Sequence, residues 1–176
     1  MGNGNPARAE LSFRASGSDR TMFEIIRMKD DADAAEEVWA LQHAAYRVEA
    51  ELIGVAELPP LQDTVESLRQ SHETFIGLRG TEGDLLGVIA YEQEQEGRYT
   101  ICRVMVNPDY FRQGVGSRLL AHLLESVPGA HWSVTAEARN LPALALYERA
   151  GFSRTGAFQP APDITLVQLE RNKSRT

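Results

Sequence analysis

Two closely spaced glycines, Gly114 and Gly116, lie where an apolar strand-like run ends and a helical pattern begins. The first turn of a helix has backbone N–H groups without partners inside the helix, and glycine lets an anion approach them closely. Arg112 adds positive charge beside them. The segment therefore predicts a site for a negatively charged ligand, although the glycines taken alone are also typical of an ordinary tight turn.

Two better-known phosphate motifs do not fit this segment. The dinucleotide fingerprint needs a third glycine where Leu119 stands, and the chain has no Gly-Lys-Ser/Thr sequence of the kind that nucleotide triphosphatases use. The predicted anion site must therefore hold a different phosphate ligand.

Apolar periodicity around these glycines predicts an α/β (α+β) fold. Acidic residues after the first strand begin a helix, Ile53–Gln62 is a loop with two prolines, and Asp63 and Glu66 form a capping box for a short helix. One further helix begins near Val115, and another spans Ala143–Ala150. The strands are expected at Phe23–Arg27, Glu73–Leu78, Leu85–Glu92, Tyr99–Val106, His131–Ala136, from Phe152 onward, and Ile164–Leu169.

Length and charge narrow the class of protein. The 176 residues predict a poorly ordered tail over 1–21 and a single domain over 22–176. Eighteen basic against 25 acidic residues give a net charge of -7, which disfavours nucleic acid and anionic membranes as partners. Cys102 is the only cysteine, so we expect a cytoplasmic protein without an internal disulfide, and the scattered histidines predict no metal site.

Two segments together resemble the GNAT superfamily of acetyl-CoA-dependent N-acetyltransferases. The window Phe111–Gly116 is similar to the family's Arg/Gln-x-x-Gly-x-Gly/Ala motif, with Phe111 in place of the first Arg or Gln. Downstream, Asn140–Phe152 is similar to the family's Asn-x-x-Ala-x-x-Leu-Tyr-x-x-x-Gly-Phe segment. Two motifs in the right order are more specific than either alone, and the element order extends the resemblance over the chain beyond the tail.

The resemblance implies a central mixed sheet, flanked by helices, that splays between the strand ending at Val106 and the strand beginning at His131. Acetyl-CoA, the acetyl-donor cosubstrate, is expected in this opening. By the same resemblance, acetyl-CoA is bound by several groups of the chain. These are the backbone groups of Val104, Met105 and Val106, the charge of Arg112, the amides of Gln113, Gly114, Val115, Gly116 and Ser117, and a contact from Asn140.

The resemblance also implies direct attack of a primary amine on the thioester. Tyr147 matches the family position of the acid that protonates the departing thiolate; its alternative role is a core aromatic residue. The family often has a carboxylate base on the strand where this chain has Cys102 and Arg103. Glu92 and Glu137 are the remaining candidates for the base, and exposed surface charge is the alternative for both.

The acceptor amine, of a small molecule or a peptide, is expected against the first helix and its loop. Tyr46, Glu49, Glu51 and Leu58–Leu61 could form an acidic and apolar wall there, although Tyr46 also has the spacing of a core residue. A homodimer is compatible with the family. The alternatives to an enzyme are a noncatalytic sensor of acyl-CoA and an unrelated α/β domain whose glycine turn is structural.

Overall fold

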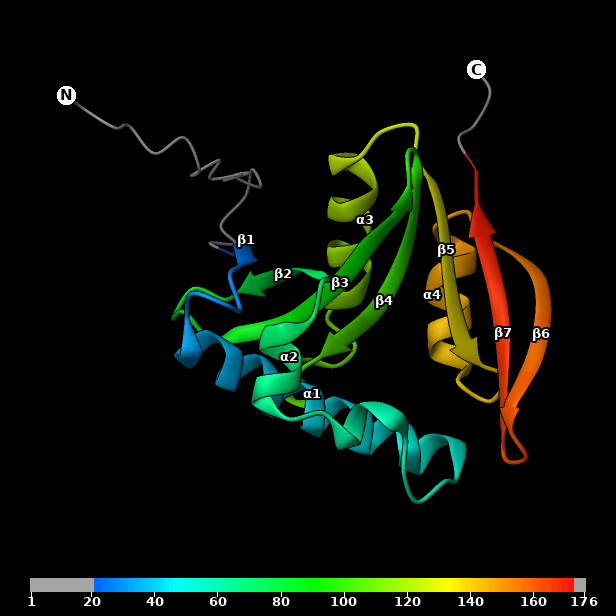
Figure 1. Cartoon of the computed structure of the whole chain (residues 1–176), viewed down its shortest axis with the longest axis horizontal. Coiled ribbons are helices and arrows are strands. Elements are labelled where there is room, and N and C mark those ends of the chain that lie inside the picture. Colours follow the sequence, from blue (N-terminus) through cyan, green and yellow to red (C-terminus); the bar gives the residue numbers. More distant parts are fainter. Residues whose placement is uncertain (1–20, 173–176) are drawn as a thin grey trace.

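The computed structural model describes residues 21–172, and the predicted tail lies outside them except for Thr21 (Figure 1). The elements follow the chain in the order β1 (Met22–Ile26), α1 (Ala32–Ile53), the 3-10 turn η1 (Pro59–Gln62), α2 (Val65–Gln70), β2 (Thr74–Arg79), β3 (Leu85–Gln95), β4 (Arg98–Val106), the 3-10 turn η2 (Pro108–Tyr110), α3 (Val115–Ser126), β5 (His131–Glu137), α4 (Leu141–Arg149), β6 (Ser153–Ala161) and β7 (Ile164–Arg171). Within the described part of the chain, no helix is long and apolar enough to cross a membrane.

The described strands form one mixed sheet in the order β1-β2-β3-β4-β5-β7-β6. Every neighbouring pair is antiparallel except β4 and β5, which are parallel. The crossover from β4 to β5 runs through α3, as parallel neighbours require. The expected fold, a mixed sheet flanked by helices, is confirmed.

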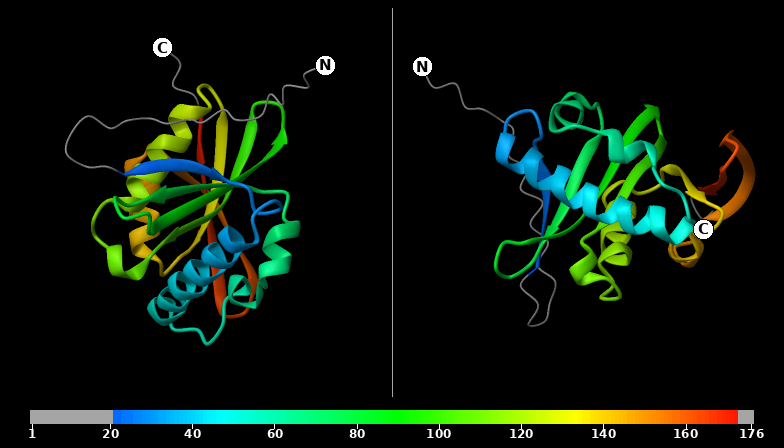
Figure 2. Two further views of the ribbon diagram at one scale, coloured as in Figure 1. Left: turned by 90° about the vertical axis from the view of Figure 1, so that its left-hand side faces the viewer. Right: turned by 90° about the horizontal axis from the view of Figure 1, so that it is seen from below.

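Helices cover both faces of this sheet, as the two further views make plain (Figure 2). Neighbouring residues of β3 belong to different cores: Val88 packs with side chains of α1 and α2, whereas Ile89 packs with α3 and α4. Successive strand residues point to opposite faces, so α1 and α2 lie on one face and α3 and α4 on the other.

Close packing of α3 on β3 depends on a glycine. A Cβ atom added at Gly87 would lie 2.8 Å from the Met105 carbonyl oxygen and 2.8 Å from a Val115 methyl carbon. A larger residue would therefore push away the first turn of α3, which carries the predicted anion site.

Two helix starts show how local sequence acts. Asp31 caps α1 by accepting a hydrogen bond from the Ala34 amide, as the acidic run there predicted. The predicted capping box of Asp63 and Glu66 is wrong: Thr64 and Ser67 form it, one position further along. Asp63 is not the cap, because one of its carboxylate oxygens pairs with Arg103 and the other accepts a hydrogen bond from the Ser67 hydroxyl.

Candidate active site

β4 and β5 pair over only part of their length. The paired residues are Arg98 with His131, Tyr99 with Trp132 and Thr100 with Ser133, and the strands then diverge (Figure 1). Along β4 after Thr100, the backbone groups that face β5 therefore have no strand partner. The splay lies where the resemblance implied it, and it leaves hydrogen-bonding groups for an extended ligand arm.

A β-bulge accompanies the start of the splay. Ala90 of β3 pairs with Arg103 and Tyr91 pairs with Ile101, so Cys102 is the extra residue of β4. A bulge bends its strand and increases the local twist, and here it lies two residues after Thr100, the last residue of β4 that pairs with β5. The bend helps to open the sheet.

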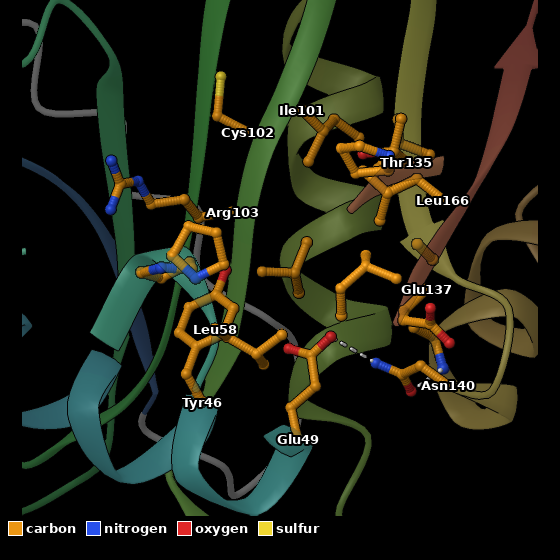
Figure 3. Close-up of a pocket in the computed structure, with 18 of the residues that line it drawn as sticks. Tyr46, Glu49, Leu58, Ile101, Cys102, Arg103, Thr135, Glu137, Asn140 and Leu166 are labelled. Carbon is orange, nitrogen blue, oxygen red and sulfur yellow. Dashed lines mark hydrogen bonds between the residues drawn. The ribbon is translucent and has the colours of Figure 1, made fainter. Parts of the chain in front are cut away.

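A cavity of about 380 Å³ fills this opening (Figure 3). Tyr46 and Glu49 of α1 form one wall, and residues of β4, β5 and α4 form the others. Leu58, Pro59 and Pro60 contribute from the loop after α1, and Ile164 and Leu166 of β7 contribute apolar surface. Of the predicted acceptor wall, Glu51 does not line this cavity and is exposed.

The start of α3 lies on the β3–β4 side of the splay. Arg112 and Gly114 both have left-handed backbone conformations, with φ of 62° and 76°, so the chain turns sharply into the helix. No side chain caps α3 at Gly114. Val115 is buried, whereas Arg112, Gln113 and Ser117 are exposed. The first-turn amides are thus available to an anion, which fits a pyrophosphate group.

Val104, Met105 and Val106 have the arrangement that a backbone-binding role needs. Met105 is fully buried on the α1 side of the sheet, so only its main chain is available to a ligand in the splay. Val104 lines the cavity. A Cβ added at Gly116 would approach Val106 to 3.7 Å and Leu146 to 3.5 Å, so this glycine lies close to both.

Tyr147 lies in the wall of the cavity and is 5% exposed. Its ring packs edge-on against Phe152. Burial raises the pKa of Tyr147 above its ordinary value, and Glu49 raises it further. Burial and Glu49 raise the pKa of Tyr46 in the same way. Both phenols therefore keep their protons near pH 7 and can donate hydrogen bonds.

Glu49 and Asn140 meet across the cavity, although they are 91 residues apart in sequence (Figure 3). Asn140 Nδ2 donates a 3.0 Å hydrogen bond to Glu49 Oε1, and Asn140 Oδ1 accepts one from Ala143 N and so caps α4. Burial raises the pKa of Glu49, the Asn140 hydrogen bond lowers it in part, and Glu137 raises it again. Asn140, expected to touch the cofactor, thus also holds a carboxylate.

Glu137, one of the two candidate bases, is 3% exposed and fully engaged. Its Oε1 accepts hydrogen bonds from the backbone N and Nε of Arg139, and its Oε2 accepts one from Thr165 N. The Arg139 side chain and these amides lower the pKa of Glu137 to about 2, against the effect of burial. A carboxylate this acidic is a weak base, so its position favours a structural role at the end of β5.

Glu92, the other candidate base, does not line the cavity that contains Tyr147. It is exposed and borders a neighbouring hollow together with Asp63, Glu73 and Arg103. The structure thus separates Glu92 from Tyr147 and lends no support to its predicted role.

No pattern in the sequence predicts the ion-pair network around Arg103. Its guanidinium donates to both carboxylate oxygens of Glu73, to Asp63 Oδ2 and to Gln42 Oε1, at 2.7 to 2.9 Å. Burial would raise the pKa values of Asp63 and Glu73, but hydrogen bonds from Arg103 lower both. The network connects β4 to α1 and to the segment before α2, and Arg103 lines both hollows.

Cys102 is half-buried and lines the cavity. Burial raises the pKa of its thiol to about 12, and the carboxylates of Glu73 and Glu92 contribute. The thiol therefore stays protonated near neutral pH and is a poor nucleophile. In the described chain, no three His, Cys, Asp or Glu side chains are grouped so that they could hold a metal ion.

Comparison with known proteins decides the family. The model of the acetyltransferase (GNAT) family matches residues 13–152. The chain belongs to the GNAT family. The match ends at Phe152 and includes both segments that resemble the family, the two splayed strands and Tyr147.

Two curated proteins are similar to the chain in sequence. UPF0157 protein YqkA of Bacillus subtilis is 40% identical over 147 residues, which are 82% of this chain and 42% of that protein. The N-alpha-acetyltransferase RimI of Mycobacterium tuberculosis is 32% identical over 112 residues, which are 62% of this chain and 70% of that protein. The chain thus spans less than half the length of the Bacillus protein.

A solved structure shows the same fold. The ribosomal-protein-S18-alanine N-acetyltransferase of Escherichia coli has a TM-score of 0.68 and 18% identity, and the similarity covers 89% of this chain and 96% of that one. At this identity the likeness concerns the GNAT fold alone.

Proposed function

We propose that this GNAT domain is an acetyl-CoA-dependent N-acetyltransferase that acts on a primary amine. The observation that carries the proposal is the splay between β4 and β5, which places the Tyr147 cavity beside unpaired β4 backbone and the uncapped start of α3. Glycine turns, free amides and an open strand edge fit the phosphates and extended arm of acetyl-CoA.

Acetyl-CoA, when bound, supplies an activated thioester. The amides of Gln113 to Ser117 would hold its pyrophosphate, and the β4 backbone from Val104 to Val106 would hold its arm. Arg112 adds positive charge at the exposed end. These contacts use mainly backbone groups, so they fix orientation without demanding particular side chains.

Tyr147 is the acid in this proposal. Its hydroxyl is protonated near neutral pH and can donate to a sulfur atom that gains negative charge as the thioester breaks. Because the Cys102 thiol stays protonated, an acyl-enzyme on this residue is disfavoured, and the amine attacks directly.

The acceptor amine enters from the α1 side, where Tyr46 and Glu49 line the cavity. We favour a peptide α-amino group as the first acceptor to test, because named relatives include an N-alpha-acetyltransferase and a ribosomal-protein alanine N-acetyltransferase. A small-molecule amine is the second class. We further propose a cytoplasmic location and leave a homodimer as a prediction to be tested by sedimentation.

The proposal is tested by incubating the protein with acetyl-CoA and two matched panels, peptides with free or blocked N-termini and small primary amines. We expect CoA release and a product heavier by one acetyl group, with free N-termini but not blocked ones. Binding of acetyl-CoA without product in either panel would instead support a sensor. No binding of acetyl-CoA would overturn the proposed function.

A further inference from the structure

The carboxylates around the splay differ in the number of hydrogen bonds and ion pairs that they form. Two of them, Glu49 and Glu137, line the cavity that contains Tyr147. Three others, Asp63, Glu73 and Glu92, border the neighbouring hollow. An amine that arrives as an ammonium ion must lose a proton before it can attack, so these groups are the candidates to receive it.

Four of these five groups are poorly suited to the task. Glu137 accepts hydrogen bonds on both oxygens, from Arg139 and Thr165. Asp63 and Glu73 are ion-paired with Arg103 at 2.7 and 2.9 Å. Glu92 is exposed and outside the cavity. Hydrogen bonds and nearby cations stabilise the charged form of a carboxylate and so reduce its tendency to take a proton.

Glu49 is in a different environment. It lies in the last two turns of α1, and its side chain points into the cavity toward α4 (Figure 3). One oxygen accepts a single hydrogen bond from the neutral amide of Asn140. Within residues 21–172 no cationic side chain forms an ion pair with it. It therefore combines partial burial with a second oxygen to which the described chain donates no hydrogen bond.

The charged and titratable groups that share its cavity come from four elements. They are Tyr46 of α1, Cys102 and Arg103 of β4, Glu137 of β5 and Tyr147 of α4. Burial raises the pKa of the thiol and of both phenols, and hydrogen bonds to Arg139 and Thr165 lower that of Glu137 to about 2. Arg103 stays charged because burial, which lowers its pKa, is outweighed by Glu73 and Asp63. Glu49 is thus the carboxylate of this set whose pKa is raised, which makes it a better proton acceptor than Glu137.

We propose that Glu49 is the general base that removes a proton from the acceptor ammonium, with Asn140 as the residue that positions its carboxylate. This role rests on the proposed acetyl transfer. The sequence alone had suggested only a substrate-binding role for Glu49, because nothing in the spacing brings α1 against the start of α4.

The atoms and protons of the step balance as follows. An N–H bond of the ammonium breaks and an O–H bond forms on Glu49. The nitrogen lone pair then attacks the thioester carbon, a C–N bond forms and the C–S bond breaks with its electron pair on sulfur. Tyr147 protonates the sulfur and is reprotonated by the second proton that the nitrogen loses. The proton on Glu49 leaves to solvent, so each turnover releases one proton.

The test uses Glu49→Gln, which keeps the size of the side chain and the oxygen that accepts from Asn140. General acid–base groups contribute roughly 10²- to 10⁴-fold in rate, so we expect kcat near pH 7 to fall by about that factor, with little change in KM. The loss should shrink by roughly tenfold for each pH unit as solvent supplies more neutral amine, because a tenfold change in free-amine fraction accompanies each unit. Glu51→Gln, an exposed neighbour on the same helix, is the matched control.

A purely electrostatic anchor for the ammonium gives a different result: a raised KM, an unchanged kcat and a pH profile of the same shape. That outcome would overturn the proposal, as would loss of kcat in Glu137→Gln but not in Glu49→Gln. If the wild-type protein acetylates no amine, the proposed function fails first. Carbon-13 NMR of glutamate-labelled protein gives a readout without turnover, and a Glu49 signal that titrates at or below the ordinary glutamate pKa would also overturn the base role.

Discussion

The backbone site beside the splay and the side-chain wall of the cavity are built on different principles. On the β3–β4 side, the start of α3 and the unpaired edge of β4 offer backbone groups, and glycines set the geometry. The cavity wall instead offers the side chains of Glu49, Asn140 and Tyr147, which come from α1 and α4 and meet across the splay. A backbone site tolerates many side chains and suits a donor that the whole family shares. A side-chain site can change its acceptor and its chemistry one residue at a time.

The largest expected effect lies on the side-chain side. Tyr147→Phe removes the hydroxyl but keeps the ring packed on Phe152, so the fold should persist. We expect kcat to fall by about 10²-fold or more, because the thiolate loses its acid, while the Kd for acetyl-CoA stays within a factor of about two. Steady-state kinetics beside calorimetric binding measures both. Unchanged kcat would reduce Tyr147 to a core aromatic residue.

A smaller effect is expected on the backbone side. Gly114→Ala places a Cβ at φ 76°, at a cost of about 1–2 kcal/mol in a left-handed conformation. No atom lies within 4 Å of that Cβ, so strain and not collision is the cause. If the loop relaxes to avoid the strain, the KM for acetyl-CoA should rise roughly tenfold with kcat at saturation unchanged. Gly97→Ala, which has a φ of 74° and no atom within 4 Å of its added Cβ, is the matched control in the turn between β3 and β4 and should leave KM unchanged.

At Gly87, on the strand against which α3 packs, we expect a change in stability without a change in chemistry. Gly87→Ala overpacks β3 against Met105 and Val115, which should cost about 1–3 kcal/mol. For a domain of this size that corresponds to a fall in Tm of roughly 2–10 °C. Gly83→Ala, by contrast, is at a positive φ of 85° and meets no neighbour, so it measures backbone strain alone, whereas Gly87→Ala measures collision alone. A Gly87→Ala variant with the Tm of wild type would show that α3 does not press on Gly87.

The smallest effect concerns Glu137, which faces Glu49 across the cavity. The pKa of Glu137 is lowered to about 2, so its charged form stabilises the fold above the unfolded pKa near 4.5, and this contribution is lost as the pH falls toward 2. Because Arg139 is half-exposed, screening leaves roughly 1–2 kcal/mol. Glu137→Gln should therefore unfold more easily than wild type at pH 7 but equally easily near pH 2. A Tm difference that does not narrow with acid would contradict the hydrogen-bond assignment.

The contrast between the two sides also explains what the sequence could predict. The order of helices and strands along the chain, the α3 glycines and the position of Tyr147 follow from local patterns and a family motif that spans few residues. The contact between Glu49 and Asn140 depends on how α1 packs across the sheet, and residues 91 positions apart leave no local signal for it. The Cys102 bulge and the Arg103 network are equally non-local, since both depend on strand pairing.

One measurement tests most directly whether the backbone site binds the donor and the side-chain site performs the chemistry. It is single-turnover acetyl transfer by Gly114→Ala and Tyr147→Phe at rising acetyl-CoA concentration. Our account predicts that saturating acetyl-CoA restores the rate of Gly114→Ala to near wild type, because only donor binding is impaired. It predicts that no concentration restores Tyr147→Phe, because proton donation is lost in the bound complex. Rescue of Tyr147→Phe by donor, or failure to rescue Gly114→Ala in a folded protein, would contradict the account.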